Sequence, residues 1–181
     1  MRLNELYNKK IKAALKEKFA YRNDMAIPKI VKISLNVGVG RHTKDKSYID
    51  GVASTLERIT GQKAVLTKSR KSISAFKVRE GNIVGVMVTL RGARMYDFLE
   101  KLINVTFPRV RDFRGVENTI IDRSGNLSYG FREHLPFPEV KADEVDNVHG
   151  LQVTIMTTAK SREEGLELFT LFGFPFKKTD K

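Results

Sequence analysis

A dense group of cations between residues 67 and 82 is the part of the chain best suited to chemistry. The stretch reads TKSRKSISAFKVREGN and carries five Lys or Arg side chains against one carboxylate, Glu80. Like charges at this spacing repel one another, so a folded protein tolerates them best where an outside anion neutralises them. Cations can contact phosphate, the serine hydroxyls can reach a sugar, and Phe76 can stack on a base. The pattern favours an exposed nucleic-acid-binding loop, and the alternative is a solvated charged face.

Other motifs give little support for catalysis or for a cofactor. NVGVGR at 36–41 follows a predicted strand, but the third glycine of a G-x-G-x-x-G nucleotide loop is missing, which favours a tight turn. His42, His134 and His149 lie far apart in the sequence, without the short spacing of metal sites. The acidic run at 143–146 is typical of a solvated loop. We therefore predict no enzyme, no metal and no cofactor.

The composition indicates a folded protein with a polyanionic partner. The 181 residues are 41% hydrophobic, enough to bury a full core. The net charge is +12 and the pI about 9.9, with +6 in residues 1–32 and +7 in residues 63–94. There is no cysteine and no apolar run of the roughly 18 to 20 residues that a membrane span needs. We expect a cytoplasmic protein whose binding face lies in the first half of the chain.

The elements that must position the cations follow from hydrophobic periodicity. Apolar residues at three- and four-residue steps predict helices, and alternating ones predict strands. The expected helices are 3–19, 46–60 closed by Gly61, 93–105 ended by Pro108, and a last helix that begins at Ser161 with Glu164 in a capping box. The expected strands are 30–40, about 63–68, 83–91, a hairpin at 118–131 around Ser124-Gly125, and 151–158.

The alternation of apolar and polar residues along the strands predicts a sheet with one apolar and one polar face. Val31, Ile33, Leu35 and Val37 would lie on the covered face, and the alternating residues of 83–91 would continue it. We predict an α+β fold: one two-layer domain over residues 1–181, with a mostly antiparallel sheet, helices on one face and the other face open for RNA. A basic loop at about 69–80 would protrude from it.

Several segments resemble one known family. They are LNVGVG at 35–40, TGQKAVLTKSRKSISAFKVREGN at 60–82, VTLRG at 88–92, FPRVRDFRG at 107–115, FPE at 137–139, TTAKSREEG at 157–165 and FPFK at 174–177. These segments are similar, in order and over essentially the whole chain, to the bacterial large-subunit ribosomal protein five family. That family binds 5S ribosomal RNA in the central protuberance. The chain departs from it at Ser74 and Ala75, where relatives commonly have Ala then Gly or Asn.

The resemblance implies three contact surfaces. For the first of them, the alternation along the strands also places polar side chains on the open face. The expected 5S rRNA-binding residues are Lys32, Ser34, Asn36, Gly38, Gly40, Gln62, Lys63, Lys68, Thr89 and Arg91. The expected loop contacting transfer RNA in the peptidyl site comprises Arg70, Lys71, Ser72, Phe76, Lys77 and Arg79. The expected intersubunit bridge comprises Arg109, Arg111, Asp112 and Arg114, with the acidic loop near 140–147 beside it. Met87 is left out of the site because some relatives are basic there.

The implied function is that of a structural constituent of the large ribosomal subunit. Its expected partners are 5S rRNA, large-subunit rRNA, P-site tRNA, a small-subunit head protein and other 5S-binding ribosomal proteins, and it would be a monomer within the ribosome. Two alternatives stay open. One is a free-standing DNA-binding or chaperone module that binds nucleic acid mainly through the basic loop. The other is a peripheral membrane protein that binds an anionic membrane through the basic amino-terminal helix.

Overall fold

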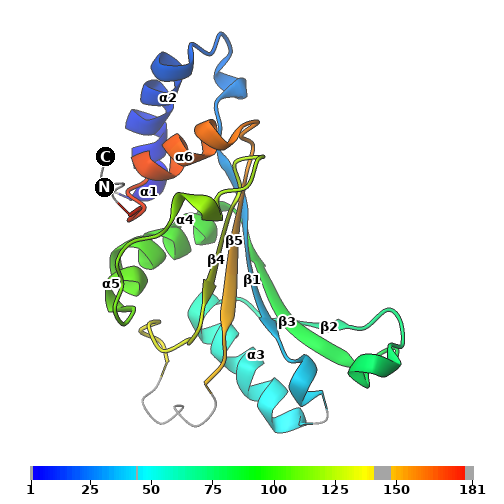
Figure 1. Ribbon diagram of the computed structural model, residues 1–181. Helices are drawn as coiled ribbons and strands as arrows, with labels where there is room; N and C mark the ends of the chain where they lie inside the picture. The colour runs from blue at the N-terminus through cyan, green and yellow to red at the C-terminus, as the bar shows by residue number, and fades with distance from the viewer. Residues whose placement is uncertain (1, 44, 141–147, 178–181) are drawn as a thin grey trace. The chain divides into compact units, whose positions relative to one another are not determined.

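The computed structural model describes residues 2–43, 45–140 and 148–177 (Figure 1). Its helices are α1 (Leu3–Leu6), α2 (Lys12–Phe19), α3 (Lys46–Thr60), α4 (Gly92–Lys101), α5 (Phe107–Arg109) and α6 (Arg162–Leu171). Its strands are β1 (Ile30–Gly38), β2 (Val65–Lys68), β3 (Ile83–Leu90), β4 (Leu127–Phe131) and β5 (Leu151–Thr157). The predicted α+β class is confirmed.

The strands form one antiparallel five-stranded sheet in the order β2-β3-β1-β5-β4. In the β2–β3 pair, Val65 lies opposite Met87 and Thr67 opposite Gly85, and the register shifts between Thr67 and Lys68. The strand β1 lies in the middle of the sheet. From Ile33 to Gly38 its residues alternate between buried and more exposed positions. This alternation gives the sheet two chemically different faces.

The chain divides into two compact units, each with its own buried core. The first unit comprises residues 1–33, 90–129 and 154–181, and the second comprises residues 34–89 and 130–153. The proposal that residues 1–181 act as a single domain remains a prediction.

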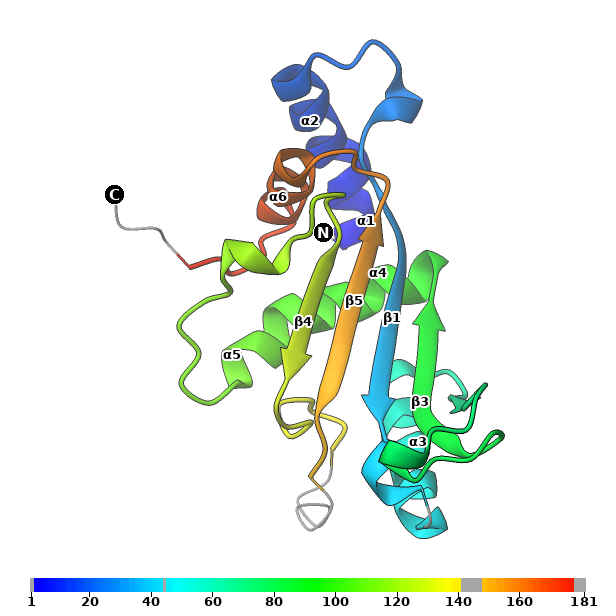
Figure 2. The same ribbon diagram turned by 45° about the vertical axis from the view of Figure 1, so that its right-hand side comes forward.

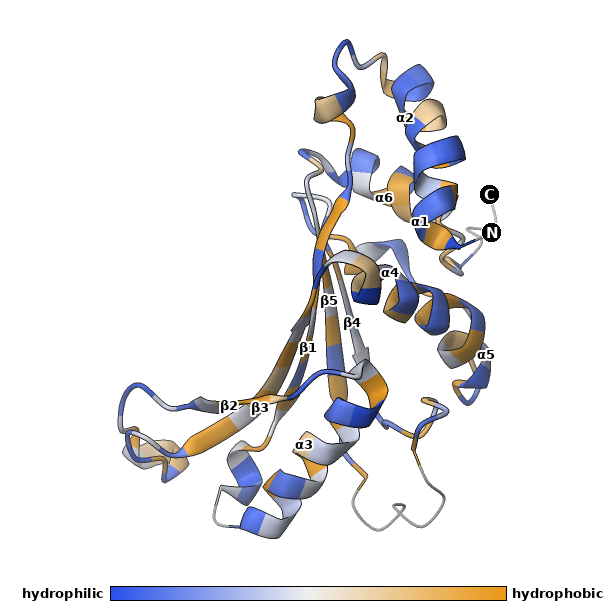
Figure 3. Cartoon of the chain, turned by 180° about the vertical axis from the view of Figure 1, so that it is seen from behind, coloured by the Kyte–Doolittle hydropathy of each residue, from blue (hydrophilic) through white to orange (hydrophobic). Residues whose placement is uncertain are grey.

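In the second unit, α3 covers one face of the strands (Figures 1 and 2). The carboxylate of Asp45 accepts a hydrogen bond from the Tyr48 N–H at 3.1 Å and caps the start of α3. Gly61, in the left-handed conformation with φ 65°, ends the helix as predicted. Figure 3 shows hydrophilic and hydrophobic segments alternating along α3. The buried side chains of this layer are Ile49, Val52, Leu56 and Ile59 from α3, and Leu35, Val37, Val86 and Val88 from the strands.

In the first unit, α1, a π-helical turn at Tyr7–Ile11 and α2 follow one another without a break. Leu3, Tyr7, Ile11 and Leu15 are buried, so the predicted amphipathic helix over 3–19 is confirmed. The Tyr7 ring stacks on Phe172 with ring centroids 6.0 Å apart. The apolar stripe of this helix is therefore covered by protein. In the described ranges, the structure contains no helix with the length and apolarity that crossing a membrane requires.

Two local predictions were wrong and one was right in part. Helical structure continues past Pro108 to Arg109, because a π turn precedes the proline and displaces the usual hydrogen-bond pattern. The predicted hairpin turns around Ser124-Gly125, where Ile121 pairs with Leu127, but only its second arm forms a strand, β4. Val31 is 43% exposed because Ile30 takes the buried position, so the alternation slips at the start of β1.

Replacing Tyr7 with Phe should lower the free energy of unfolding by about 1 to 2 kcal/mol, because the hydroxyl donates a buried 3.0 Å hydrogen bond to the Pro28 carbonyl. Burial raises the pKa of Tyr7 from 10.0 to about 12, with a further contribution from the nearby Tyr96. The unfolded chain therefore loses this proton first, and the contribution of Tyr7 should vanish as the pH rises from 10 to 12.

Urea unfolding followed by circular dichroism measures both effects. At pH 7, where both hydroxyls are protonated, Tyr96→Phe is the matched control for the hydrogen bond, since the Tyr96 ring also packs near Phe172 but its hydroxyl has no hydrogen bond to another described residue. Equal stability losses in the two variants would contradict the assignment.

Candidate nucleic-acid interface

The face of the second unit opposite α3 is polar and accessible. Asn36 is exposed on β1, and Ser34 and Thr89 are half-exposed on β1 and β3. Because side chains alternate along a strand, burying Leu35 and Val37 under α3 places Asn36 on the opposite face. Such amides and hydroxyls can hydrogen-bond to phosphate and sugar without an apolar pocket.

Gly85 lets polar groups from three strands converge on this face. A Cβ at this position would lie 2.7 Å from the Thr67 hydroxyl oxygen, 3.3 Å from the Val37 carbonyl and 3.6 Å from Asn36 Oδ1. Only a glycine leaves room for Thr67 and Asn36 to approach each other over β3. Thr67 was not among the residues predicted from the sequence, although it lies opposite Gly85 in the β2–β3 pair.

Gln62 extends the same surface at the end of α3. Its backbone N–H donates to the Thr60 hydroxyl at 3.3 Å, and its side-chain amide donates to the Thr89 carbonyl at 3.1 Å. These bonds hold Gln62 against the end of β3. We call Ser34, Asn36, Gln62, Thr67 and Thr89 the sheet-face patch.

The other expected 5S rRNA-binding residues are distributed over both units. Gly38, Gly40, Lys63 and Lys68 are exposed in the second unit, so they belong to the same compact body as the patch. Lys32 is half-exposed and Arg91 exposed, and both belong to the first unit. The structure therefore groups most of the set in one unit, and the binding role of each residue remains a prediction.

The basic stretch forms a hairpin, residues 69–82, which we call the basic hairpin. Ser69 N–H donates to the Asn82 carbonyl at 2.8 Å, and Gly81 N–H donates back to Ser69 at 3.0 Å. Farther along, Ile73 and Val78 exchange two backbone hydrogen bonds of 2.9 and 3.2 Å. The predicted loop is thus a two-stranded ribbon with its own ladder.

The tip of the basic hairpin presents its side chains to solvent. The hydroxyl of Ser72 accepts a hydrogen bond from the Glu80 N–H at 2.9 Å, and Lys77 adopts the left-handed conformation with φ 53° to close the turn. Phe76 is 74% exposed. The expected transfer-RNA residues Arg70, Lys71, Ser72, Lys77 and Arg79 are also exposed, and Figure 3 shows hydrophilic chain on the arm that follows β2.

The expected bridge residues lie at the end of α5 and in the turn that follows it, in the first unit. Arg109, Arg111, Asp112 and Arg114 are all exposed, and Asp112 has a positive φ of 53°. They form a compact run of charge at a surface turn. The acidic loop expected beside them lies outside the described residues from 141 to 147.

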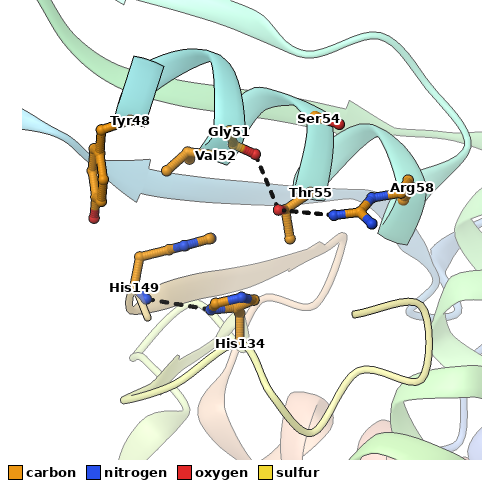
Figure 4. A pocket seen from close by; sticks show the side chains of 8 residues that line it. All are labelled: Tyr48, Gly51, Val52, Ser54, Thr55, Arg58, His134 and His149. Atoms are coloured by element: carbon orange, nitrogen blue, oxygen red, sulfur yellow. Dashed lines mark hydrogen bonds between the residues drawn. The ribbon is translucent and has the colours of Figure 1, made fainter. Parts of the chain in front are cut away.

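Two histidines that are far apart in the sequence meet in the second unit. The rings of His134 and His149 stack with centroids 3.9 Å apart, and His149 N–H donates to His134 Nδ1 at 3.3 Å (Figure 4). They line a cavity of about 120 Å³ beside α3, together with Thr55 and Arg58. Within the described ranges, no group of three or more His, Cys, Asp or Glu side chains is placed to hold a metal ion.

The chain is similar to known proteins over most of its length. Residues 23–79 match the family described as Ribosomal protein L5, and residues 83–176 match the model that describes the C-terminus of the same ribosomal family. The large ribosomal subunit protein uL5 of Desulforapulum autotrophicum is 51% identical, covering 97% of this chain and 98% of its own. The uL5 protein of Moorella thermoacetica is 51% identical over 98% of this chain and 98% of its own length. The uL5 protein of Marinomonas sp. is 48% identical over 98% of this chain and 99% of its own length.

Replacing Gly85 with Ala should lower the free energy of unfolding by about 1 to 3 kcal/mol, because the new methyl group forces the Thr67 side chain away and crowds the Val37 carbonyl. Gly40→Ala is the matched control, since nothing lies within 4 Å of a Cβ built there and its φ is not in the left-handed region. Thermal unfolding of the two variants measures the difference. A Gly85→Ala protein as stable as Gly40→Ala would show that the strands do not approach this closely.

Proposed function

The chain belongs to the ribosomal protein L5 family and is a structural constituent of the large ribosomal subunit, not an enzyme, and from this premise we propose that its sheet-face patch binds 5S ribosomal RNA. The observation that carries the proposal is the polar convergence over Gly85. There the Thr67 hydroxyl oxygen and Asn36 Oδ1 lie 2.7 and 3.6 Å from the position of a Gly85 Cβ. Figure 2 shows that α3 covers the opposite face of the strands.

The chemistry of the patch suits an irregular RNA helix. Amide and hydroxyl groups bond to riboses and phosphates, and the exposed Lys63 and Lys68 add positive charge in the same unit. Uniform A-form duplex hides its base edges in a deep, narrow groove, so a helix interrupted by loops offers more to such a patch. Binding should weaken with salt, with a slope of log K against log salt of roughly −0.7 to −0.9 per phosphate contact.

The basic hairpin would contact transfer RNA in the peptidyl site. Its ladder holds the tip as a stiff projection, and its exposed cations and Phe76 suit a phosphate backbone with an adjacent base or ribose. A hairpin that is already formed loses less conformational entropy on binding than a loop without internal hydrogen bonds.

The remaining partners follow from the family. The exposed run Arg109, Arg111, Asp112 and Arg114 would contact a protein of the small-subunit head as an intersubunit bridge. Large-subunit rRNA and other 5S-binding ribosomal proteins would adjoin the chain, which would be present as a monomer. The protein is located in the ribosome, and the cytoplasmic location expected from the sequence is part of this proposal.

Replacing Asn36 with Ala should weaken 5S rRNA binding by about 1 to 3 kcal/mol, because an RNA group buried against the patch loses its hydrogen-bond partner. Filter binding of the full-length chain to 5S rRNA at fixed salt measures the affinity. Asn104→Ala, at an exposed position of the first unit, is the matched control. Unchanged affinity in Asn36→Ala would remove the sheet-face proposal. Random duplex DNA as competitor tests the DNA-binding alternative, which predicts that DNA displaces the 5S rRNA equally well.

Replacing Lys71, Lys77 and Arg79 together with Gln should leave 5S rRNA affinity within about twofold and reduce the protection of transfer RNA bound in the peptidyl site. The reason is that these cations project from the hairpin and do not belong to the patch. Chemical footprinting of transfer RNA on ribosomes reconstituted with the variant protein measures the contact.

The control for this triple variant is Lys46→Gln with Arg123→Gln and Arg132→Gln, which removes the same charge from exposed positions elsewhere. Collapse of 5S rRNA binding in the hairpin variant alone would reverse the assignment of the two surfaces.

A further inference from the structure

A second hollow of the second unit is large, cationic and separate from the sheet-face patch. It has a volume of about 1820 Å³ and lies between the turn that follows β1, the start of α3, the basic hairpin and residues 148–150. Pockets that enclose small molecules are usually about 300 to 1,000 Å³. The hollow is therefore sized for a segment of a polymer, and we call it the hairpin groove.

Positive charge dominates the described lining of the hairpin groove. Arg41, Lys77 and Arg79 contribute cations from two separate segments, the turn after β1 and the basic hairpin. The acidic side chain among the described lining residues is Asp45, and its carboxylate is engaged in capping α3 through the Tyr48 N–H. An anionic strand in the groove would thus meet cations on two sides.

An aromatic pair stands beside these cations. The rings of His42 and Tyr48 are stacked with centroids 4.2 Å apart and an angle of 30° between their planes. Backbone hydrogen bonds hold the turn that carries His42. The His42 N–H donates to the Val39 carbonyl at 2.9 Å, and the Asp45 N–H donates to the His42 carbonyl at 3.0 Å. His42 is exposed, so the stack presents an aromatic surface to the groove.

We propose that the hairpin groove binds an unpaired segment of RNA, with its phosphates on Arg41, Lys77 and Arg79 and a base stacked on the His42–Tyr48 pair. Cationic grooves with aromatic platforms bind single strands because every base has a face that can stack. A duplex does not fit this chemistry, since its bases are stacked on one another inside the helix. The inference rests on the proposed role in RNA binding and adds a surface that does not share residues with the sheet-face patch.

The direct probe is a fluorescein-labelled octamer of uridylate, whose binding to the full-length chain is followed by fluorescence anisotropy. Arg41→Gln should weaken binding about 3- to 10-fold and reduce the salt slope by about 0.7, the value for one phosphate contact on a single strand. His42→Ala should weaken binding about 5- to 100-fold through the loss of a stacking surface. Circular dichroism checks that both variants fold.

The matched control is Arg132→Gln, which removes the same charge from an exposed position of the same unit outside the groove. It should leave both the affinity and the salt slope unchanged. If Arg132→Gln and Arg41→Gln weaken binding equally, the octamer responds to net charge alone and the proposal fails. Unchanged binding in His42→Ala would likewise overturn it.

Parallel measurements with 5S rRNA separate this inference from the proposed function. Loss of 5S rRNA binding in Asn36→Ala, with octamer binding intact in both groove variants, would contradict the inference and support the sheet-face proposal. Intact 5S rRNA binding in Asn36→Ala, with octamer binding lost in the groove variants, would contradict the sheet-face proposal alone. Unlabelled large-subunit rRNA and transfer RNA then compete with the octamer. Displacement by either identifies the source of the strand, and displacement by neither overturns the proposal.

Discussion

The packing of α3 on one face of β1 and β3 is the interaction on which the proposed surfaces depend. Leu35, Val86 and Leu56 are fully buried in this layer, and apolar burial of this kind contributes roughly 1.5 to 3 kcal/mol per side chain. Because strand side chains alternate, the same packing turns Asn36 and Thr89 to the other face. A slip of one residue in β1 would exchange the faces and bury the amide. The register of β1 therefore sets both the buried core and the face that we propose to bind RNA.

Backbone geometry then positions the polar groups. Gly85 leaves room for the Thr67 hydroxyl and the Asn36 amide over β3, and backbone hydrogen bonds hold the basic hairpin as a two-stranded ribbon. The hydrogen bond from the Tyr48 N–H to Asp45 affects two surfaces. It caps the start of α3, which covers the sheet, and it gives a partner to the carboxylate that lines the hairpin groove. The surfaces proposed to bind RNA would thus be formed before binding, which lowers its entropic cost.

The sequence predicted those features that depend on local periodicity and end signals. The helix ending at Gly61 and the alternation of β1 from Ile33 are examples, because burial of a single face leaves a clear pattern in the chain. It did not predict contacts between distant segments. The stacking of His134 on His149 and the approach of Thr67 to Asn36 depend on strand pairing and loop paths that no local pattern encodes. The helical structure at Pro108 was not predicted, because the π turn that accommodates the proline leaves no pattern in the sequence. Membership of the family rested on motifs, and the comparisons confirmed it.

Hydrogen–deuterium exchange of the full-length chain, free and bound to 5S rRNA, tests whether the RNA lies on the polar face of the strands. RNA on this face should slow exchange in peptides covering residues 34–38, 62–68 and 85–89. It should leave exchange unchanged in peptides from α3, whose backbone is on the far side of the layer. Slower exchange confined to α3, with the strand peptides unchanged, would show that the RNA binds the other face.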